Sequence, residues 1–275
     1  MVAGSVSISA TGSHIFDIGG LHKVELLQRD FQGTVRVAGM QDQVGDGTGT
    51  RVWPTALPLL LYMQGLCPQM QQSLEITRPL RILELGAGCG LLGVGLAATC
   101  GAEVLLTDAD VALDEGGTTL DWLEKNVVLN AEAIDSNGGS ATVARQVWGD
   151  GRDSENIQTL CPDGFDLVVG SDILYFPEWH PQLLSTVTTF AGSSAEAQQH
   201  HGPGHGHVGE LDPKRSVAVL GYQTRNGAEK RFGQSSDFQV LTSDLPATPA
   251  AAAMAAKKGR NPTSKTVEHF FVVED

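Results

Sequence analysis

Three alternating glycines follow an acidic residue at the end of a short apolar run, an arrangement that could bind a nucleotide-type ligand. Leu80 to Leu85 has the pattern of a buried strand, and Glu84 lies near its end. Gly86, Gly88 and Gly90 come next, and an apolar run typical of a buried helix follows. Glycines let a backbone pass close to a ligand, and a helix start offers N–H groups. The spacing therefore predicts a strand, a ligand-binding turn and a helix.

The spacing of these glycines differs from the dinucleotide-binding fingerprint, whose third glycine comes three places after the second. Here the glycines alternate, and Glu84 precedes the first of them. A carboxylate at that place would repel a pyrophosphate and attract a cationic amino-acid end. We therefore expect a ligand with a cationic end, and a plain strand-to-helix turn is the alternative.

A second acid, Asp108, lies at the end of the next apolar run. Glu103 to Thr107 is typical of a buried strand, and Asp108 follows it directly. In nucleotide-binding folds an acid at this strand end accepts hydrogen bonds from ribose hydroxyls. Helix capping is the alternative, although Asp110 could serve that purpose. The strand-end position favours the ribose role.

A third acid, Asp172, stands close to Tyr175 after another buried strand. That strand is expected over Phe165 to Gly170, and Ser171 follows it. In an open parallel sheet the ligand crevice lies beyond the carboxyl ends of the strands, where the strand order reverses. We expect the reversal between the first and fourth strands. It would bring Asp172 and Tyr175 to the same crevice as the loop with Gly86, Gly88 and Gly90, which we call the glycine loop. Helix capping by Asp172 and packing by Tyr175 are the alternatives.

Two tryptophans could supply flat apolar surfaces for a ligand. Trp53 lies just before a helix that we expect over Ala56 to Met63, with a kink at Pro58. Trp148 ends the expected third strand and precedes a polar loop, where its ring could cover an adenine face. A core position for Trp53 and a rim position without a ligand for Trp148 are the alternatives.

The elements that must position these residues alternate as strands and helices, so we expect one α/β domain over residues 14–275. Residues 1–13, rich in Ser, Gly, Ala and Thr, are expected to be disordered. Short alternating runs between His14 and Val37 predict a small β-meander. Two stretches, at about 192–213 and 245–265, have the composition of flexible insertions. The first holds four histidines, but its Gly and Pro content disfavours a metal site.

Charge and composition exclude several classes of protein. A net charge of −14 disfavours a broad nucleic-acid interface and is compatible with a basic partner. No apolar stretch approaches the roughly 20 residues that span a bilayer, so we expect no membrane partner. The N-terminus lacks the pattern of a secretory signal. We expect free thiols, no metal and a cytoplasmic protein, with the nucleus as a second location; the four cysteines are Cys67, Cys89, Cys100 and Cys161.

Taken together, these motifs resemble the seven-strand S-adenosylmethionine-dependent protein-lysine methyltransferases of methyltransferase family 16. The matching stretches are VWP at 52–54, LELGAGCGLLG at 83–93, TD at 107–108, NVVLN at 126–130, VWG at 147–149 and SDILY at 171–175. The resemblance implies a Rossmann-like α/β sheet of seven strands with helices on both faces, beside the N-terminal β-meander. It also implies S-adenosyl-L-methionine as the cofactor.

Carried over by position, the resemblance assigns roles to individual residues. The implied cofactor-binding residues are Trp53, Glu84, Gly86, Ala87, Gly88, Asp108, Trp148 and Ser171. The implied catalytic residues, Asp172 and Tyr175, lie where the methyl acceptor enters. Members often have an acidic residue after the tyrosine of the fifth strand, and this chain has Gln223 there.

The resemblance implies methyl transfer to the side-chain amine of a lysine in a protein substrate. A carboxylate at Asp172 suits a cationic acceptor, and the ring face of Tyr175 could hold the lysine side chain. Methyltransferases for planar amides or base amines tend to carry Asn-Pro-Pro-Tyr at this strand end, where an amide pairs with a flat N–H group. The alternatives are a methyltransferase for a small basic metabolite or another side chain, a non-catalytic binding module, and a nicotinamide-dependent oxidoreductase, which the glycine spacing disfavours. The target protein and the oligomeric state are not specified by the sequence.

Overall fold

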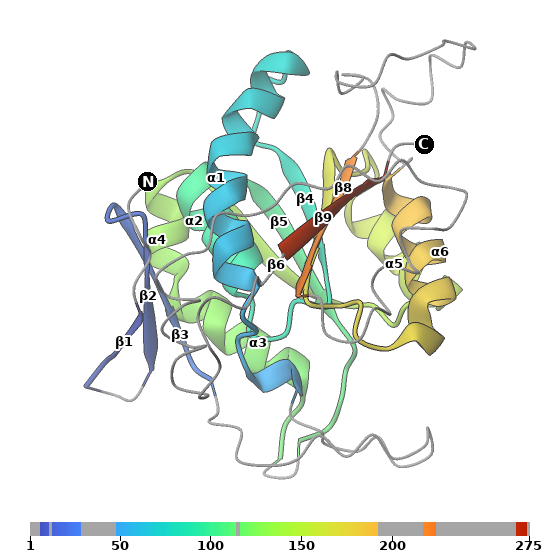
Figure 1. Cartoon of the computed structure of the whole chain (residues 1–275), viewed down its shortest axis with the longest axis horizontal. Coiled ribbons are helices and arrows are strands. Elements are labelled where there is room, and N and C mark those ends of the chain that lie inside the picture. Colours follow the sequence, from blue (N-terminus) through green and yellow to red (C-terminus); the bar gives the residue numbers. More distant parts are fainter. Residues whose placement is uncertain are drawn as a thin grey trace.

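A mostly parallel sheet forms the centre of the chain (Figure 1). The computed structural model describes residues 6–10, 13–28, 48–113, 116–191, 217–223 and 268–273. Within this part of the chain the sheet has six strands in the order β6-β5-β4-β7-β8-β9. β4 to β8 run parallel, and β9 pairs antiparallel with β8. The strands are β4 (Arg81–Leu85), β5 (Glu103–Asp108), β6 (Ser140–Arg145), β7 (Leu167–Ser171), β8 (Val217–Gln223) and β9 (Glu268–Val273).

The strand order reverses between β4 and β7, as predicted. The chain moves outward from β4 to β5 and β6, then returns to β7 on the other side of β4. In the register, Leu85 lies beside Thr107 of β5, and Ile82 lies beside Leu167 of β7. The carboxyl ends of β4, β5 and β7 therefore meet at one edge of the sheet, where ligands bind in folds of this kind.

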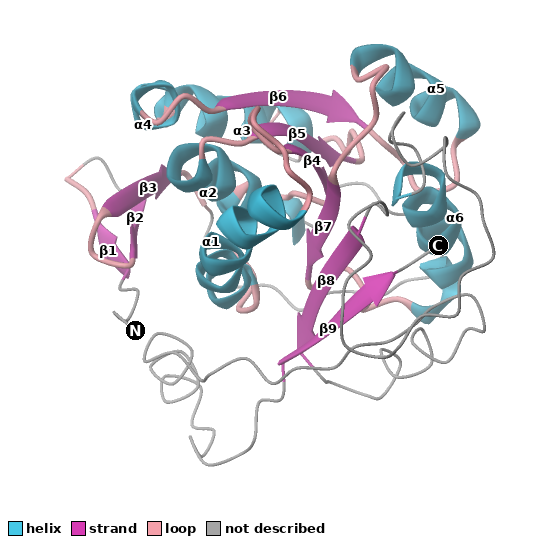
Figure 2. Cartoon of the chain, turned by 90° about the horizontal axis from the view of Figure 1, so that it is seen from above, coloured by secondary structure: helices cyan, strands magenta, loops and turns pink. Residues whose placement is uncertain are grey.

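Helices cover both faces of this sheet because its central strands are apolar on both sides. Along β4, Ile82 packs into one buried cluster with α1 and α2, and Leu83 packs into another with α6. Figure 2 shows α1, α2 and α4 on one side of the sheet and α5 and α6 on the other. The helices are α1 (Ala56–Ser73), α2 (Leu91–Cys100), α3 (Thr119–Leu129), α4 (Ala131–Ser136), α5 (Gly151–Leu160) and α6 (His180–Ala191), with short 3-10 turns η1 (Thr48–Thr50) and η2 (Pro177–Trp179).

A small antiparallel sheet precedes this layer, as predicted, but one of its strands lies in the segment expected to be disordered. It has the order β1-β2-β3, with β1 (Val6–Ile8), β2 (His14–Ile18) and β3 (His22–Leu26). β1 pairs with β2 along its whole length, so the prediction of disorder is wrong for these three residues. The meander strand expected near Val35 and Val37 lies outside the described residues.

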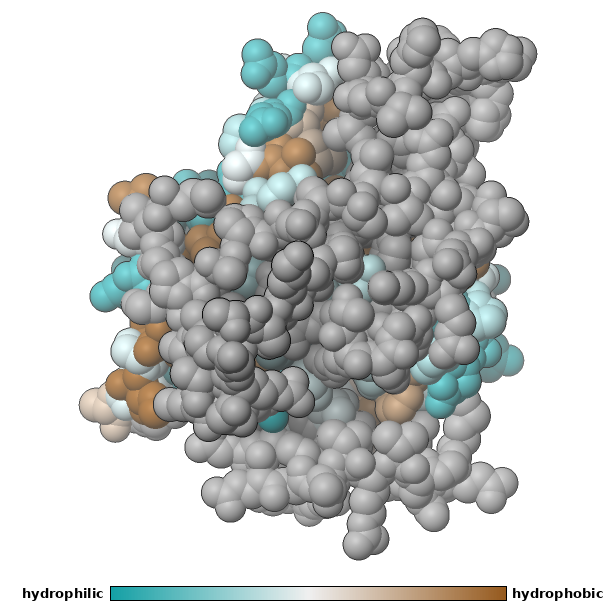
Figure 3. Space-filling view, in the orientation of Figure 1, coloured by the Kyte–Doolittle hydropathy of each residue, from teal (hydrophilic) through white to brown (hydrophobic). Residues whose placement is uncertain are grey.

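α1 and α5 differ from the sequence prediction. α1 continues to Ser73, and Pro58 does not interrupt it because a proline in the first turn has no intrahelical N–H partner to lose. α5 occupies a stretch whose beginning was expected to be a loop, and Asp150 caps it by accepting hydrogen bonds from the N–H groups of Arg152 and Asp153. Figure 3 shows hydrophilic side chains over the projecting end of α1.

The predicted flexible insertions lie outside the described residues. The division of the chain into one domain with two insertions therefore stays a prediction. Among the described helices, each is too short or too polar to cross a bilayer.

Candidate functional site

The glycine loop joins β4 to α2 and has a backbone that only glycines adopt easily. Gly86, Gly88 and Gly90 have φ angles of 64°, 54° and 83°. The loop is also crowded, because a Cβ atom at Gly86 would lie 2.7 Å from Cγ2 of Ile173 and 3.3 Å from the ring of Trp148. Both the conformation and the close packing therefore require glycine at the first position of the motif.

Glu84 lies beneath this loop, within the fold. Its side chain is 1% exposed, and its Oε2 accepts a hydrogen bond of 2.9 Å from the N–H of Gly93 in the first turn of α2. Burial raises the pKa of Glu84 to about 8; the charge of Asp108 adds to this rise and the bond from Gly93 opposes it. The structure thus places this carboxyl on a helix N-terminus, and its role toward a cationic ligand stays a prediction.

Asp108 connects the end of β5 to the glycine loop. Its two carboxylate oxygens accept hydrogen bonds from the N–H groups of Gly88, at 2.6 Å, and Ala109, at 2.7 Å. The N–H of Ala87 donates to the carbonyl of Thr107 in the same strand, at 2.9 Å. The sequence-predicted residues Ala87, Gly88 and Asp108 are therefore brought together at the sheet edge. Ribose binding by Asp108 stays a prediction.

Trp148 lies beside the first glycine, although it does not end a strand as expected. β6 ends at Arg145, so the ring is carried by the loop that follows. Trp179 packs edge-on against this ring with 5.9 Å between centroids, and the hydroxyl of Thr186 accepts a hydrogen bond from the N–H of Gly149 at 2.9 Å. α6 and η2 therefore support the Trp148 loop. A role for the ring beside adenine stays a prediction.

Asp172 follows β7 in an unusual conformation. Its φ is 56°, which is strained for a residue with a Cβ, and its side chain is buried. The carboxylate accepts a hydrogen bond from the N–H of Thr55 at 2.9 Å, directly before α1. Asp172 therefore does bind a helix terminus, that of α1, as the alternative of helix capping suggested. The strain is consistent with a functional constraint on this residue.

Ile173 brings the Asp172 stretch to the glycine loop, because it packs on Gly86. Ser171 ends β7 beside Gly221 of β8. Tyr175 is half-buried, and its ring lies 4.5 Å from that of Phe176, measured between centroids. Residues 171–175, where the methyl acceptor is expected to enter, therefore run from the end of β7 to the edge of the glycine loop.

Trp53 lies at the entrance of α1, as expected, and its ring is half-buried. Its Nε1 donates a hydrogen bond of 3.1 Å to the carbonyl of Thr48, and the guanidinium of Arg51 lies over the ring at 5.5 Å. Thr55, two residues on, carries the N–H that binds Asp172. The turn after Trp53 is thereby connected to the end of β7.

Sequence reasoning missed two contributors to the glycine loop. Gly49 in η1 covers Gly88, since a Cβ at Gly88 would lie 3.3 Å from the carbonyl of Gly49. Asn126 on α3 is buried and donates a hydrogen bond of 2.9 Å to the carbonyl of Cys89. A signal for Asn126 was present, because an amide stands within the apolar stripe that includes Leu123 and Val127.

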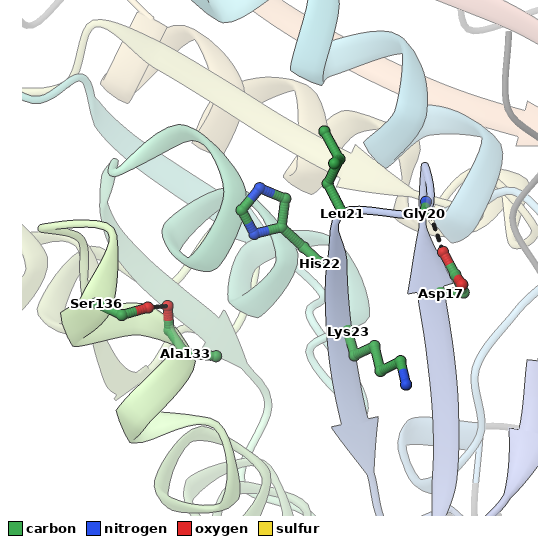
Figure 4. Close-up of a pocket in the computed structure, with 7 residues that line it drawn as sticks. All are labelled: Asp17, Gly20, Leu21, His22, Lys23, Ala133 and Ser136. Carbon is green, nitrogen blue, oxygen red and sulfur yellow. Dashed lines mark hydrogen bonds between the residues drawn. The ribbon is translucent and has the colours of Figure 1, made fainter.

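A surface pocket of about 370 Å³ lies elsewhere, between the turn of the β2–β3 hairpin and α4 (Figure 4). Two of its polar groups are engaged locally: Asp17 accepts from the N–H of Gly20 at 2.7 Å, and Ser136 donates to the carbonyl of Ala133 at 3.0 Å. It contains none of the predicted site residues. In the described part of the chain, no group of three or more His, Cys, Asp or Glu side chains is arranged to hold a metal ion.

Comparison with known proteins gives matches along much of the chain. A family model described as lysine methyltransferase matches residues 36–198. EEF1A lysine methyltransferase 3 of Mus musculus is 30% identical over 203 residues, which cover 68% of this chain and 77% of that protein. Protein N-lysine methyltransferase METTL21A of Mus musculus is 32% identical over 141 residues, which cover 51% of this chain and 55% of that protein.

The fold is also found among solved structures. A methyltransferase crystallised with SAH has a TM-score of 0.52 at 10% identity, and the match covers 97% of this chain and 57% of that one. At this identity the likeness concerns the fold alone.

Proposed function

Because the chain belongs to the lysine methyltransferase family, we propose that it transfers a methyl group from S-adenosylmethionine to the side-chain amine of a lysine in a protein substrate. One observation carries the proposal beyond the family. Ile173, in the stretch expected to meet the acceptor, packs directly on Gly86 in the loop expected to meet the donor. Methyl transfer needs donor and acceptor side by side, since most of the catalytic gain comes from alignment.

The residues at the sheet edge fit S-adenosylmethionine. The positive-φ glycines form a turn that a Cβ at Gly86 would fill, and a carboxylate and an aromatic ring lie beside it. The donor would be held by Trp53, Glu84, Gly86, Ala87, Gly88, Asp108, Trp148 and Ser171. When bound, this group supplies a methyl on a positively charged sulfur, which is already activated for transfer to a nucleophile.

The remaining task of the protein is to bring in a lysine and let it lose its proton. Asp172 places a carboxylate at the end of β7, which would attract and orient the incoming ammonium. The half-buried ring of Tyr175 would hold the aliphatic part and the charge by its face. Burial lowers the pKa of a lysine from about 10.4, so the amine can become neutral at the site. Water takes the proton in this scheme, and we assign no general base.

The partner that we propose is a protein substrate. The chain carries a net charge of −14, which favours a basic segment of the substrate and disfavours nucleic acid. We also propose a cytoplasmic location, with the nucleus as a second one, and no membrane partner. Relatives in Mus musculus and Xenopus tropicalis carry the name EEF1A lysine methyltransferase 3, so purified EEF1A is the first single substrate to test.

The test is a transfer assay with methyl-tritiated S-adenosylmethionine and a cell extract, followed by mass spectrometry of the labelled proteins. We expect label on a lysine side chain of a protein, and none with Asp108→Ala. Label confined to small molecules, with intact SAH binding by calorimetry, would contradict a protein substrate. Failure of the folded protein to bind SAH would contradict methyl transfer altogether.

A further inference from the structure

Asn126 hydrogen-bonds in two directions from the middle of α3. Its side chain is fully buried, with 0% exposure. On one side its Oδ1 accepts from the N–H of Leu27 at 2.7 Å, and its Nδ2 donates to the carbonyl of Leu27 at 3.1 Å. On the other side the same Nδ2 donates to the carbonyl of Cys89 at 2.9 Å. One amide therefore joins the end of β3 to the glycine loop.

Asn130, the residue that directly follows α3, binds the same strand without that second contact. Its amide accepts from the N–H of Glu25 at 2.9 Å and donates to the carbonyl of Glu25 at 2.7 Å. Its Nδ2 also donates to the carbonyl of Asn126 at 2.7 Å. Both asparagines hold the N-terminal sheet on α3, and the hydrogen bond to Cys89 distinguishes Asn126 from Asn130.

The bond to Cys89 fixes a part of the loop that its other anchors do not. The N–H groups of Ala87 and Gly88 are held by β5, through Thr107 and Asp108. The Cys89 carbonyl is instead held by α3, through Asn126. Since three glycines with positive φ leave this loop much conformational freedom, its shape depends on contacts of this kind.

We propose that Asn126 is a positioning residue for the methyl donor: it holds the glycine loop in its binding conformation and links that conformation to the N-terminal sheet. The inference rests on the proposed function, because it assumes that this loop binds S-adenosylmethionine. It adds a role for the first residue of the NVVLN stretch and for β3, which lies outside the main sheet.

The test compares Asn126→Ala with Asn130→Ala, a matched control that removes the same kind of side chain and the same pair of hydrogen bonds to the β3 segment. Affinity for SAH is measured by calorimetry, melting temperature by differential scanning fluorimetry, and KM separately for donor and acceptor. We expect both variants to melt earlier. We expect Asn126→Ala to weaken SAH binding about tenfold, the effect of losing one buried hydrogen bond, and to raise the donor KM in parallel. Asn130→Ala should leave SAH affinity near that of the wild type.

Equal SAH affinity in wild type and folded Asn126→Ala, or equal losses in both variants, would overturn the inference. If Asn126→Ala is not recovered folded, Asn126→Ser takes its place, because its hydroxyl is too short to reach both Leu27 and Cys89. A wild-type protein that binds no SAH would instead overturn the proposed function, so the two failures are distinguishable.

Discussion

The carboxylate of Asp172 accepts a hydrogen bond from the backbone N–H of Thr55, with 2.9 Å between the two atoms. The N–H of Asp172 in turn donates to the carbonyl of Gly221 at 2.8 Å. These bonds hold a positive-φ residue in place between α1 and β8. The acid proposed to meet the substrate is therefore also a structural contact, and a test of its chemistry must separate the two roles.

Asp172→Asn makes that separation, because an amide oxygen can still accept from Thr55 while the charge is lost. We expect kcat/KM for the acceptor to fall on the order of 100-fold, since a preorganised charge at a reacting group has effects of this size. SAH affinity and melting temperature should stay close to wild type. Asp150→Asn is the control, because Asp150 caps α5 in a comparable way. Unchanged transfer by a folded Asp172→Asn would remove this charge from the mechanism.

Gly86→Ala should damage both the donor site and the fold. The new Cβ would lie 2.7 Å from Ile173 at a φ of 64°, so overpacking and backbone strain add. We expect a loss of about 1–3 kcal/mol in the free energy of unfolding, measured with urea, together with weaker SAH binding. Gly65→Ala is the control, because a Cβ there meets nothing within 4 Å on an exposed part of α1. It should stabilise the protein by about 1 kcal/mol. Equal effects of the two changes would contradict the crowding at Gly86.

The sheet edge was predictable because its signals are local. Apolar runs, alternating glycines and strand-end acids predicted the reversal between β4 and β7 and the meeting of Gly86 with the Asp172 stretch. The hydrogen-bond partners of these residues were not predictable, because they are far away in the sequence. Asp172 and Thr55 are 117 residues apart, and Asn126 and Leu27 are 99 residues apart. Such contacts depend on how separate elements pack, which local patterns do not specify.

α5 and β1 were missed for a different reason. α5 buries only Asp153 and Ile157 of its ten residues, so it has few apolar positions from which a helix could be predicted. β1 is three residues long and exposed along its length, so pairing with β2 defines it rather than composition. Short or mostly exposed elements carry little sequence signal, even where their backbone structure is regular.

Glu75→Gly should stabilise the protein. Glu75 comes directly after Leu74, the C-cap of α1, and has a φ of 54°, at a position where glycine is strongly favoured. Relief of left-handed strain exceeds the added entropy of the unfolded glycine, so we expect a gain of about 0.5–1 kcal/mol in the free energy of unfolding, measured with urea. Glu75→Ala should give no such gain, because alanine keeps the strain. Equal stabilisation by both would mean that loss of the charge, and not the backbone angle, is responsible.

Glu84 should make stability fall as pH rises. Burial raises the pKa of this carboxyl from 4.5 to about 8, so between these values the folded protein binds more protons than the unfolded chain. Its contribution is therefore fully present below about pH 4.5 and is lost as pH rises toward 8. Glu84→Gln keeps an oxygen for the N–H of Gly93 and cannot titrate, so it should remove this dependence.

The measurement is urea unfolding of both proteins at pH 5.5, 6.5 and 7.5 and constant ionic strength, with the pH values chosen inside the window of about 4.5 to 8. The stability of the wild type relative to Glu84→Gln should decline with pH, by at most about 1.4 kcal/mol per unit. A difference that is flat or rises with pH would show that the carboxyl is ionised in the folded protein. A bound cationic ligand would favour the ionised carboxyl and lower this pKa, so the expected attraction by Glu84 concerns the ligand-bound protein.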